Sequence, residues 1–185
     1  MNLPLFPITK PSDIPAELRS TPIADLLVYH NLGRRFKKYT RAQLLISMCM
    51  DSRKQLRIPS NFAYILRSGG ANLRYSGFKV SYAIAVGGVR HIALIAHNHC
   101  GMVNLASQKE RFVNGLVQRA GWQRRAAEKH FKEAAPRYEI GNEIDFILRE
   151  TRRLRTQYPK VQVAPLFYRI EDSRLYCVAE NHGSR

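Results

Sequence analysis

The sequence predicts an α/β fold, with a mostly parallel central β-sheet flanked by helices, an extended N-terminal arm and a C-terminal β-hairpin. Apolar runs of strand length alternate along the chain with longer segments of helical period, which is the order typical of a parallel sheet. The runs are apolar on both faces, as are strands covered by helices on both sides. In such sheets ligands bind at the carboxyl ends of the strands, so the residues there are the first candidates for a site.

The N-terminal part is expected to be an arm followed by one helix. Residues 1–14 hold three of the nine prolines and show little periodicity, which favours an extended segment. A helix is expected over residues 22–32, because Thr21 suits the N-cap position and Pro22 the first helical position. We therefore assign residues 1–41 to an arm and helix, and residues 42–185 to the α/β unit of a single domain.

The remaining elements alternate as the fold class requires. Buried strands are expected at residues 42–50, 63–66 and 91–96, which are short apolar runs. Helices are expected at residues 77–87, 108–135 and 143–158; Gly87 and Gly88 end the first and Pro159 stops the last. Residues 161–170 and 175–178 read as a strand, a turn and a return strand.

Composition limits the classes of function. The chain has 185 residues, of which 45% are hydrophobic and 24% charged, as in a globular domain. No apolar run approaches the roughly 18 to 20 residues of a membrane span, and the N-terminus lacks the features of a signal peptide. Three cysteines, an odd number, favour reduced thiols over a disulfide framework. We therefore expect a cytoplasmic protein without a membrane span.

The net charge is unusually positive. Lys and Arg number 30 against 14 Asp and Glu, which gives +16, and the basic clusters are spread over residues 34–38, 124–125 and 152–155. Polyanions are attracted to such a surface. Since no compact nucleic-acid-binding motif accompanies the charge, we expect non-specific binding of polyanions.

Candidate metal ligands follow two of the predicted strands. Cys49 ends one strand, and His97 and Cys100 follow another. Neighbouring parallel strands bring their carboxyl ends together, and two thiolates with one imidazole suit zinc. Three protein ligands, with no obvious fourth, are typical of a catalytic rather than a structural zinc site. Cys177 has no such neighbours and is expected to be a small buried hydrophobe.

Two charged residues share a face with the first candidate ligand. In an extended chain Cys49, Asp51 and Arg53 point to the same side. A carboxylate beside a metal can accept a proton or hydrogen bond from bound water, and a guanidinium can hold that carboxylate through two bonds. The spacing therefore indicates catalytic roles for Asp51 and Arg53.

These motifs resemble those of the β-class carbonic anhydrases. The family pattern of Cys-x-Asp-Ser-Arg, followed by a strand ending in His-x-x-Cys-Gly, is matched by Cys49, Asp51, Ser52, Arg53, His97, Cys100 and Gly101. The segments AYILRSGGAN and VSYAIAVGGVRHIALIAHNHCGM are also similar to the family, and the resemblance covers about residues 42–180. The turn at residues 67–70 departs from the Arg-Asn-Ala-Gly that the family often has. His99, between the ligands, is expected to be an ordinary surface histidine.

The resemblance implies a function. It implies one Zn²⁺ per subunit, held by Cys49, His97 and Cys100, and reversible hydration of carbon dioxide to bicarbonate and a proton. It also implies a homodimer or a multiple of dimers, in which the N-terminal arm would cross onto the neighbour. Two alternatives stay open: hydrolysis of carbon disulfide or carbonyl sulfide on the same fold, and a non-catalytic zinc protein that binds polyanions.

Overall fold

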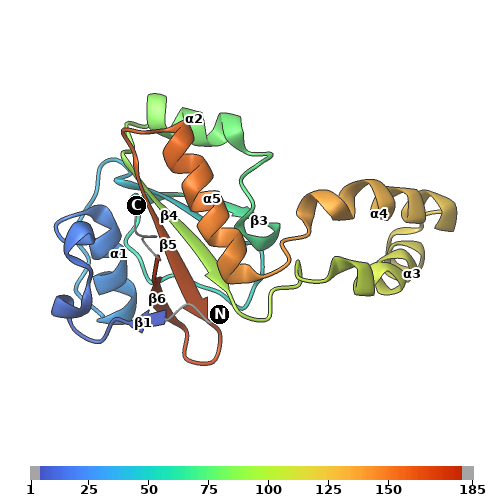
Figure 1. The fold of residues 1–185 in the computed structure, drawn as a ribbon, viewed down its shortest axis with the longest axis horizontal. Helices are drawn as coiled ribbons and strands as arrows, with labels where there is room; N and C mark the ends of the chain where they lie inside the picture. Colours follow the sequence, from blue (N-terminus) through green and yellow to red (C-terminus); the bar gives the residue numbers. More distant parts are fainter. Residues whose placement is uncertain (1–4, 181–185) are drawn as a thin grey trace.

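The computed structural model describes residues 5–180, which form one sheet covered by helices (Figure 1). The sheet has six strands in the order β1-β6-β5-β4-β2-β3. Neighbours among β2 to β5 run parallel, whereas β6 runs antiparallel to β5 and to β1. The strands are β1 (Leu5–Pro7), β2 (Leu44–Cys49), β3 (Ala63–Ser68), β4 (His91–His97), β5 (Gln162–Arg169) and β6 (Arg174–Val178). The predicted mostly parallel sheet and C-terminal hairpin are confirmed.

The central strands are buried on both faces. In β2 and β4 every residue from Leu44 to Cys49 and from Ile92 to His97 is buried. The helices are α1 (Pro22–Asn31), α2 (Gly77–Ala85), α3 (Lys109–Ala120), α4 (Arg124–Tyr138) and α5 (Glu143–Gln157). Alternate residues of β2 enter two different cores, Ile46 on the side of α1 and Leu45 on the side of α2 and α5.

Helix α1 begins as the sequence predicts. The Thr21 hydroxyl accepts a hydrogen bond from the backbone N–H of Ala24, and Pro22 is the first helical residue. Leu26 and Leu27 are fully buried against the sheet. The helix therefore belongs to the same packed body as the strands.

The N-terminal arm lies on its own sheet. Strand β1 pairs with β6, with Leu5 opposite Val178, and the residues that follow bury Ile8, Ile14 and Leu18. These apolar side chains are covered without a second chain. The described part of the arm is therefore packed rather than a free extended segment, and the predicted crossing onto a neighbour is not needed to bury it.

The long helix expected over residues 108–135 is two helices. Gly121 adopts φ 71°, and its N–H bonds the carbonyl of Leu116, so it ends α3 in the left-handed conformation that glycine tolerates. Helix α4 begins three residues later, at Arg124, and α3 and α4 pair as a hairpin that projects from the sheet (Figure 1). No helix within residues 5–180 is long and apolar enough to cross a membrane.

Candidate metal centre

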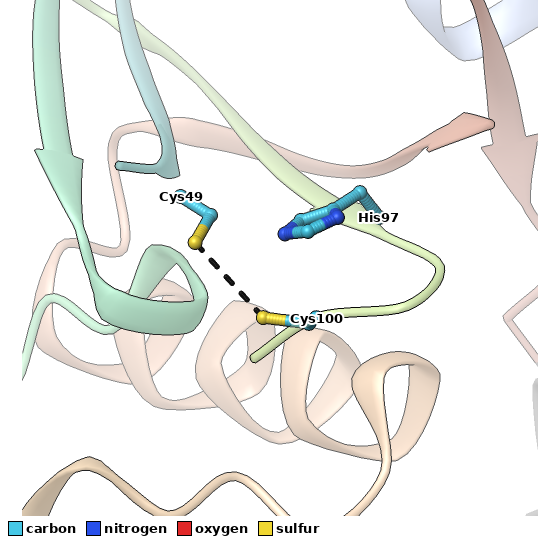
Figure 2. Close-up of side chains that lie close together, drawn as sticks. All are labelled: Cys49, His97 and Cys100. Atoms are coloured by element: carbon cyan, nitrogen blue, oxygen red, sulfur yellow. Dashed lines mark hydrogen bonds between the residues drawn. The ribbon is translucent and has the colours of Figure 1, made fainter. Parts of the chain in front are cut away.

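The sheet topology brings the three candidate ligands together. From β2 the chain first adds β3 on one side and then returns to place β4 on the other, so the ends of β2 and β4 meet where the strand order reverses. Cys49 is the last residue of β2, His97 is the last of β4, and Cys100 lies in the following turn. Their ligand atoms lie within 4.8 Å of one another, and all three side chains are buried (Figure 2).

The histidine is oriented to coordinate a metal. Nδ1 of His97 lies 2.8 Å from the carbonyl oxygen of Asn98, and because a carbonyl only accepts, Nδ1 carries the proton. Nε2 then keeps its lone pair, and it is buried without a hydrogen-bond partner among the described residues. Such an atom is rare in a folded protein, and a role as a metal ligand would account for it.

The two thiols act as a pair. Sγ of Cys49 lies 3.9 Å from Sγ of Cys100 (Figure 2). The hydrogen bond from Cys100 lowers the pKa of the Cys49 thiol, with backbone N–H groups of Asp51 and Gly70 adding to the effect, whereas the same bond and burial raise the pKa of Cys100. One proton therefore leaves the pair easily and the second leaves with difficulty unless a cation is bound.

The turn after β3 is shaped to meet the Cys49 sulfur. Gly70 donates its N–H to Sγ of Cys49 across 3.3 Å and adopts φ 62°. A Cβ at Gly70 would lie 2.7 Å from Cγ2 of Ile140, so both the backbone angle and the space require glycine. This contact was not predicted from the sequence, although the pair Gly69–Gly70 directly after a strand was the signal for it.

Asp51 and Arg53 form a bidentate ion pair at the edge of the centre. Nε of Arg53 lies 3.0 Å from Oδ1 and Nη2 lies 2.6 Å from Oδ2 of Asp51, and the Arg53 backbone N–H adds a bond of 2.9 Å. These hydrogen bonds hold the pKa of Asp51 well below its usual range. Nη2 of Arg53 also bonds the carbonyl of His99, which ties this pair to the loop that carries Cys100.

Two residues near the ligands have other contacts. The His99 side chain is largely exposed, and its Nε2 lies 3.2 Å from Oε1 of Glu171, in the turn between β5 and β6. Cys177 is buried in β6, and burial raises its pKa to about 12. Neither belongs to the cluster of ligand atoms.

The surroundings of the cluster are mostly apolar. Cys49 and Cys100 pack with Ile140 and Phe146, and Met102 lies against this group. One carboxylate also reaches it: Glu143, the first residue of α5, accepts the backbone N–H of Cys100 at 3.3 Å. Glu143 was not predicted from the sequence, because its position depends on the packing of α5 against the site.

An apolar groove of about 500 Å³ opens between the metal centre and the α3–α4 hairpin. Met50, next to Cys49, and Met102 line one side. Phe112 of α3 and Phe131 and Tyr138 of α4 line the other. The three candidate ligands do not themselves line the groove, whereas Met50, the residue after Cys49, does.

Comparison with known proteins agrees with this geometry. A family model described as carbonic anhydrase matches residues 44–175, most of the chain. The chain belongs to the β-carbonic anhydrase family. The match runs from the start of β2 to the start of β6 and includes both loops that carry the candidate ligands.

Solved structures of β-carbonic anhydrases share the fold. A carbonic anhydrase from Glaciozyma antarctica is 20% identical with a TM-score of 0.60, over 90% of this chain and all of that one. Isoform I from Trichomonas vaginalis is 17% identical with a TM-score of 0.61, over 80% of this chain and 89% of that one. A carbon disulfide hydrolase is 17% identical with a TM-score of 0.53, over 78% of this chain and 87% of that one. No protein of curated function matches the sequence.

Proposed function

We propose that this β-carbonic anhydrase family member catalyses the zinc-dependent, reversible hydration of carbon dioxide to bicarbonate and a proton. The observation that carries the proposal is the convergence of two sulfur atoms and the unpartnered Nε2 of His97 at the ends of β2 and β4. A set of three protein ligands leaves a coordination position for water or substrate. One Zn²⁺ per subunit is the expected cofactor.

The donors fit zinc. Cys49, His97 and Cys100 supply the sulfur and nitrogen ligands that zinc prefers, and all three side chains are buried. Bound zinc would supply Lewis-acid activation of water at the open position. Glu143 and Gly70 hold the backbone and sulfur of the two cysteines in place through their hydrogen bonds.

Asp51 and Arg53 would orient the water at the open coordination position. Asp51 is kept ionised by Arg53, so its carboxylate can accept a hydrogen bond from that water. Arg53 grips both carboxylate oxygens, which keeps Asp51 from turning onto the metal. We therefore assign the catalytic roles to Asp51 and Arg53.

The groove suits carbon dioxide, which is small, linear and without charge. Its lining by methionine and aromatic side chains also suits carbon disulfide or carbonyl sulfide, which have the same shape. A carbon disulfide hydrolase is among the proteins with this fold. These sulfur compounds are therefore the second substrates to test.

The deciding experiment is the stopped-flow rate of carbon dioxide hydration on protein of known zinc content, between about pH 7 and 9. The two thiolates already cancel the formal charge of zinc, so bound water is acidified less than at a three-histidine site and the rate should rise with pH. Asp51→Ala should abolish the rate enhancement. A zinc-loaded protein inactive on carbon dioxide and on the sulfur substrates would favour a zinc protein that binds polyanions through its +16 charge.

We also propose a homodimer or a multiple of dimers. Edge strand β3 and helix α2 leave large apolar side chains exposed, among them Tyr64, Ile65, Phe78, Tyr82 and Val86. The free edge of β3 adds unpaired backbone groups to this surface. A second copy would cover both the apolar side chains and the edge.

Further proposals concern the domain organisation, the cellular compartment and the binding of polyanions. We propose that residues 1–41 and 42–185 act as one domain, since α1 shares a core with β2 and β4. We propose the cytoplasm as its compartment, where the free thiols Cys49, Cys100 and Cys177 stay reduced. Polyanion binding is expected to be non-specific and to weaken with salt.

A further inference from the structure

The side chain of Asn98, the residue after the ligand His97, is bonded at both ends to the turn between β5 and β6. Its Oδ1 accepts the backbone N–H of Ile170 at 2.9 Å, and its Nδ2 donates to Oε1 of Glu171 at 2.6 Å. A backbone N–H only donates and a carboxylate only accepts, so the two partners fix the orientation of the amide. One turn therefore holds both polar ends of this side chain.

These bonds extend the contact between β4 and β5 beyond the sheet. The two strands pair as far as His97, which lies opposite Tyr168. After that pair the chain of β4 bends away, and the Asn98 side chain reaches the backbone of Ile170 in its place. The start of the second ligand loop is thus tied to the strand beside it.

The backbone of Asn98 orients the imidazole of His97. The carbonyl oxygen of Asn98 lies 2.8 Å from Nδ1 of His97, and this bond leaves Nε2 as the nitrogen that can bind a metal. The ring extends toward the two sulfur atoms of the cluster (Figure 2). A shift of this carbonyl would turn the ring or favour the other tautomer, because the ring follows its hydrogen-bond acceptor.

The next residue of the loop has a backbone angle that needs support. His99 adopts φ 55°, in the left-handed region that is uncommon for a residue with a side chain. Its carbonyl accepts Nη2 of Arg53 at 2.9 Å, and its Nε2 lies 3.2 Å from the same Oε1 of Glu171 that Asn98 contacts. Such a conformation persists when its surroundings hold it, so the loop depends on these outside contacts for its shape.

We propose that Asn98 is a positioning residue of the metal centre, whose side chain, held by Ile170 and Glu171, fixes the backbone carbonyl that orients the imidazole of His97. This inference rests on the proposed function, since it requires that Nε2 of His97 binds zinc. Asn98 does not itself touch the metal and acts through His97. Glu171 acts one step farther out, through the Asn98 amide.

The first test is the zinc affinity of variants of the two side chains, measured by competition with a chromophoric chelator. Asn98→Ala removes both bonds, and we expect zinc affinity to fall about 10-fold, the lower end of the effect of removing groups that support metal ligands. Glu171→Ala should show part of this loss, and Glu171→Gln, which keeps an acceptor for the Asn98 amide, should restore the wild-type affinity. Asn114→Ala is the matched control, because this exposed asparagine of α3 also has a side-chain bond, to Arg124.

A second measurement follows the imidazole itself. In metal-free protein at about pH 8, where an ordinary imidazole is neutral, the ¹⁵N chemical shifts of the His97 ring report which nitrogen carries the proton. We expect Nδ1–H in wild type and a mixture of both tautomers in Asn98→Ala, with the signals identified by their loss in His97→Gln. With Co²⁺ in place of zinc, Asn98→Ala should also change the visible absorption spectrum, which depends on ligand geometry.

These readouts separate positioning from stability. If Asn98 merely fastens the turn, Asn98→Ala lowers the Tm but leaves zinc affinity, tautomer and Co²⁺ spectrum as in wild type, and the inference is overturned. If Asn98→Ala does not fold, the Glu171 variants decide, and equal zinc affinity in Glu171→Ala and wild type overturns it. A wild-type chain that binds neither metal overturns the proposed function as well, whereas metal binding that these variants leave unchanged overturns this inference alone.

Discussion

Arg53 holds Asp51 by both carboxylate oxygens, with Nη2 2.6 Å from Oδ2 and Nε 3.0 Å from Oδ1. The same guanidinium reaches the carbonyl of His99 at 2.9 Å, on the loop that carries Cys100. One side chain therefore fixes the carboxylate and ties it to the second ligand loop. Substitution of Arg53 therefore tests both the restraint on Asp51 and the link to the second ligand loop.

Removal of Arg53 should free Asp51 to turn onto the metal and close the open coordination position. We expect Arg53→Ala to lower the rate of carbon dioxide hydration about 100-fold or more, the size of effect that a positioned acid–base group supplies. Zinc content should stay at one per chain, because the three donors remain. Stopped-flow rates on zinc-quantified protein measure both.

Two controls accompany this variant. Arg53→Lys keeps the charge but loses the two-pronged geometry, so its activity should stay well below wild type. Arg35→Ala removes an exposed arginine from the basic segment before β2 and should leave the rate unchanged. A rate in Arg53→Ala equal to that of wild type would show that Asp51 needs no such restraint.

The substitution Gly70→Ala should destabilise the candidate metal centre, because position 70 has neither the space nor the backbone angle for a side chain. The new Cβ would lie 2.7 Å from Cγ2 of Ile140, and φ 62° is unfavourable for alanine. We expect the free energy of unfolding to fall by about 2 kcal/mol or more and zinc affinity to weaken, because the N–H that meets the Cys49 sulfur must move. Urea unfolding and chelator competition measure the two effects.

Gly88→Ala is the matched control for this substitution. Gly88 has φ 70° but nothing within 4 Å of a new Cβ, so only the backbone cost of about 1 kcal/mol applies. Its zinc affinity should equal that of wild type. Equal losses of stability and of zinc affinity in the two variants would refute the role assigned to the Gly70 contact.

Much of the fold, and the meeting of the candidate metal ligands, could be predicted because they depend on local pattern. Buried strands such as β2 are apolar on both faces, and Thr21 and Pro22 mark the start of α1. Cys49 and His97 end neighbouring parallel strands, so the meeting of their side chains follows from the order of elements.

Other features of the fold and of the candidate site could not be predicted from the local pattern. Gly121 breaks the expected long helix, although a glycine inside a helical pattern is often tolerated. Glu143 reaches Cys100 only because α5 packs across the end of β4, and Lys54 is buried although its neighbours in sequence are exposed. No periodicity in one sequence gives the burial of a single lysine in a loop.

The apolar surface on α2 and β3 predicts a change of oligomeric state. Phe78 is 83% exposed, and Phe78→Asp places a charge in the surface that we assign to a second copy. We expect light scattering to show a lower mass than wild type, with an unchanged far-ultraviolet circular dichroism spectrum. Lys79→Asp, at the adjacent exposed position, should keep the wild-type mass. Equal masses for wild type and Phe78→Asp would argue against this interface.

His30 should make stability depend on pH. Its Nδ1 accepts the Arg57 backbone N–H at 3.1 Å and its Nε2 donates to the Ser173 carbonyl at 2.9 Å, so the folded chain holds the neutral ring. Burial lowers its pKa below the ordinary 6.5, with the charge of Arg57 adding to the effect.

Because the unfolded chain binds the proton more readily, this contribution to stability is fully present above about pH 6.5 and is lost as the pH falls through the folded pKa. Each unit of lowering corresponds to about 1.4 kcal/mol. His30→Asn can still accept the Arg57 N–H but does not titrate, so its free energy of unfolding should fall less than that of wild type between pH 7.5 and 5.5. Urea unfolding at both values measures this, and His130→Asn, which replaces an exposed histidine of α4 far from this contact in sequence, is the control that should keep the wild-type dependence. If wild type and His30→Asn lose the same stability on acidification, His30 is not the group responsible.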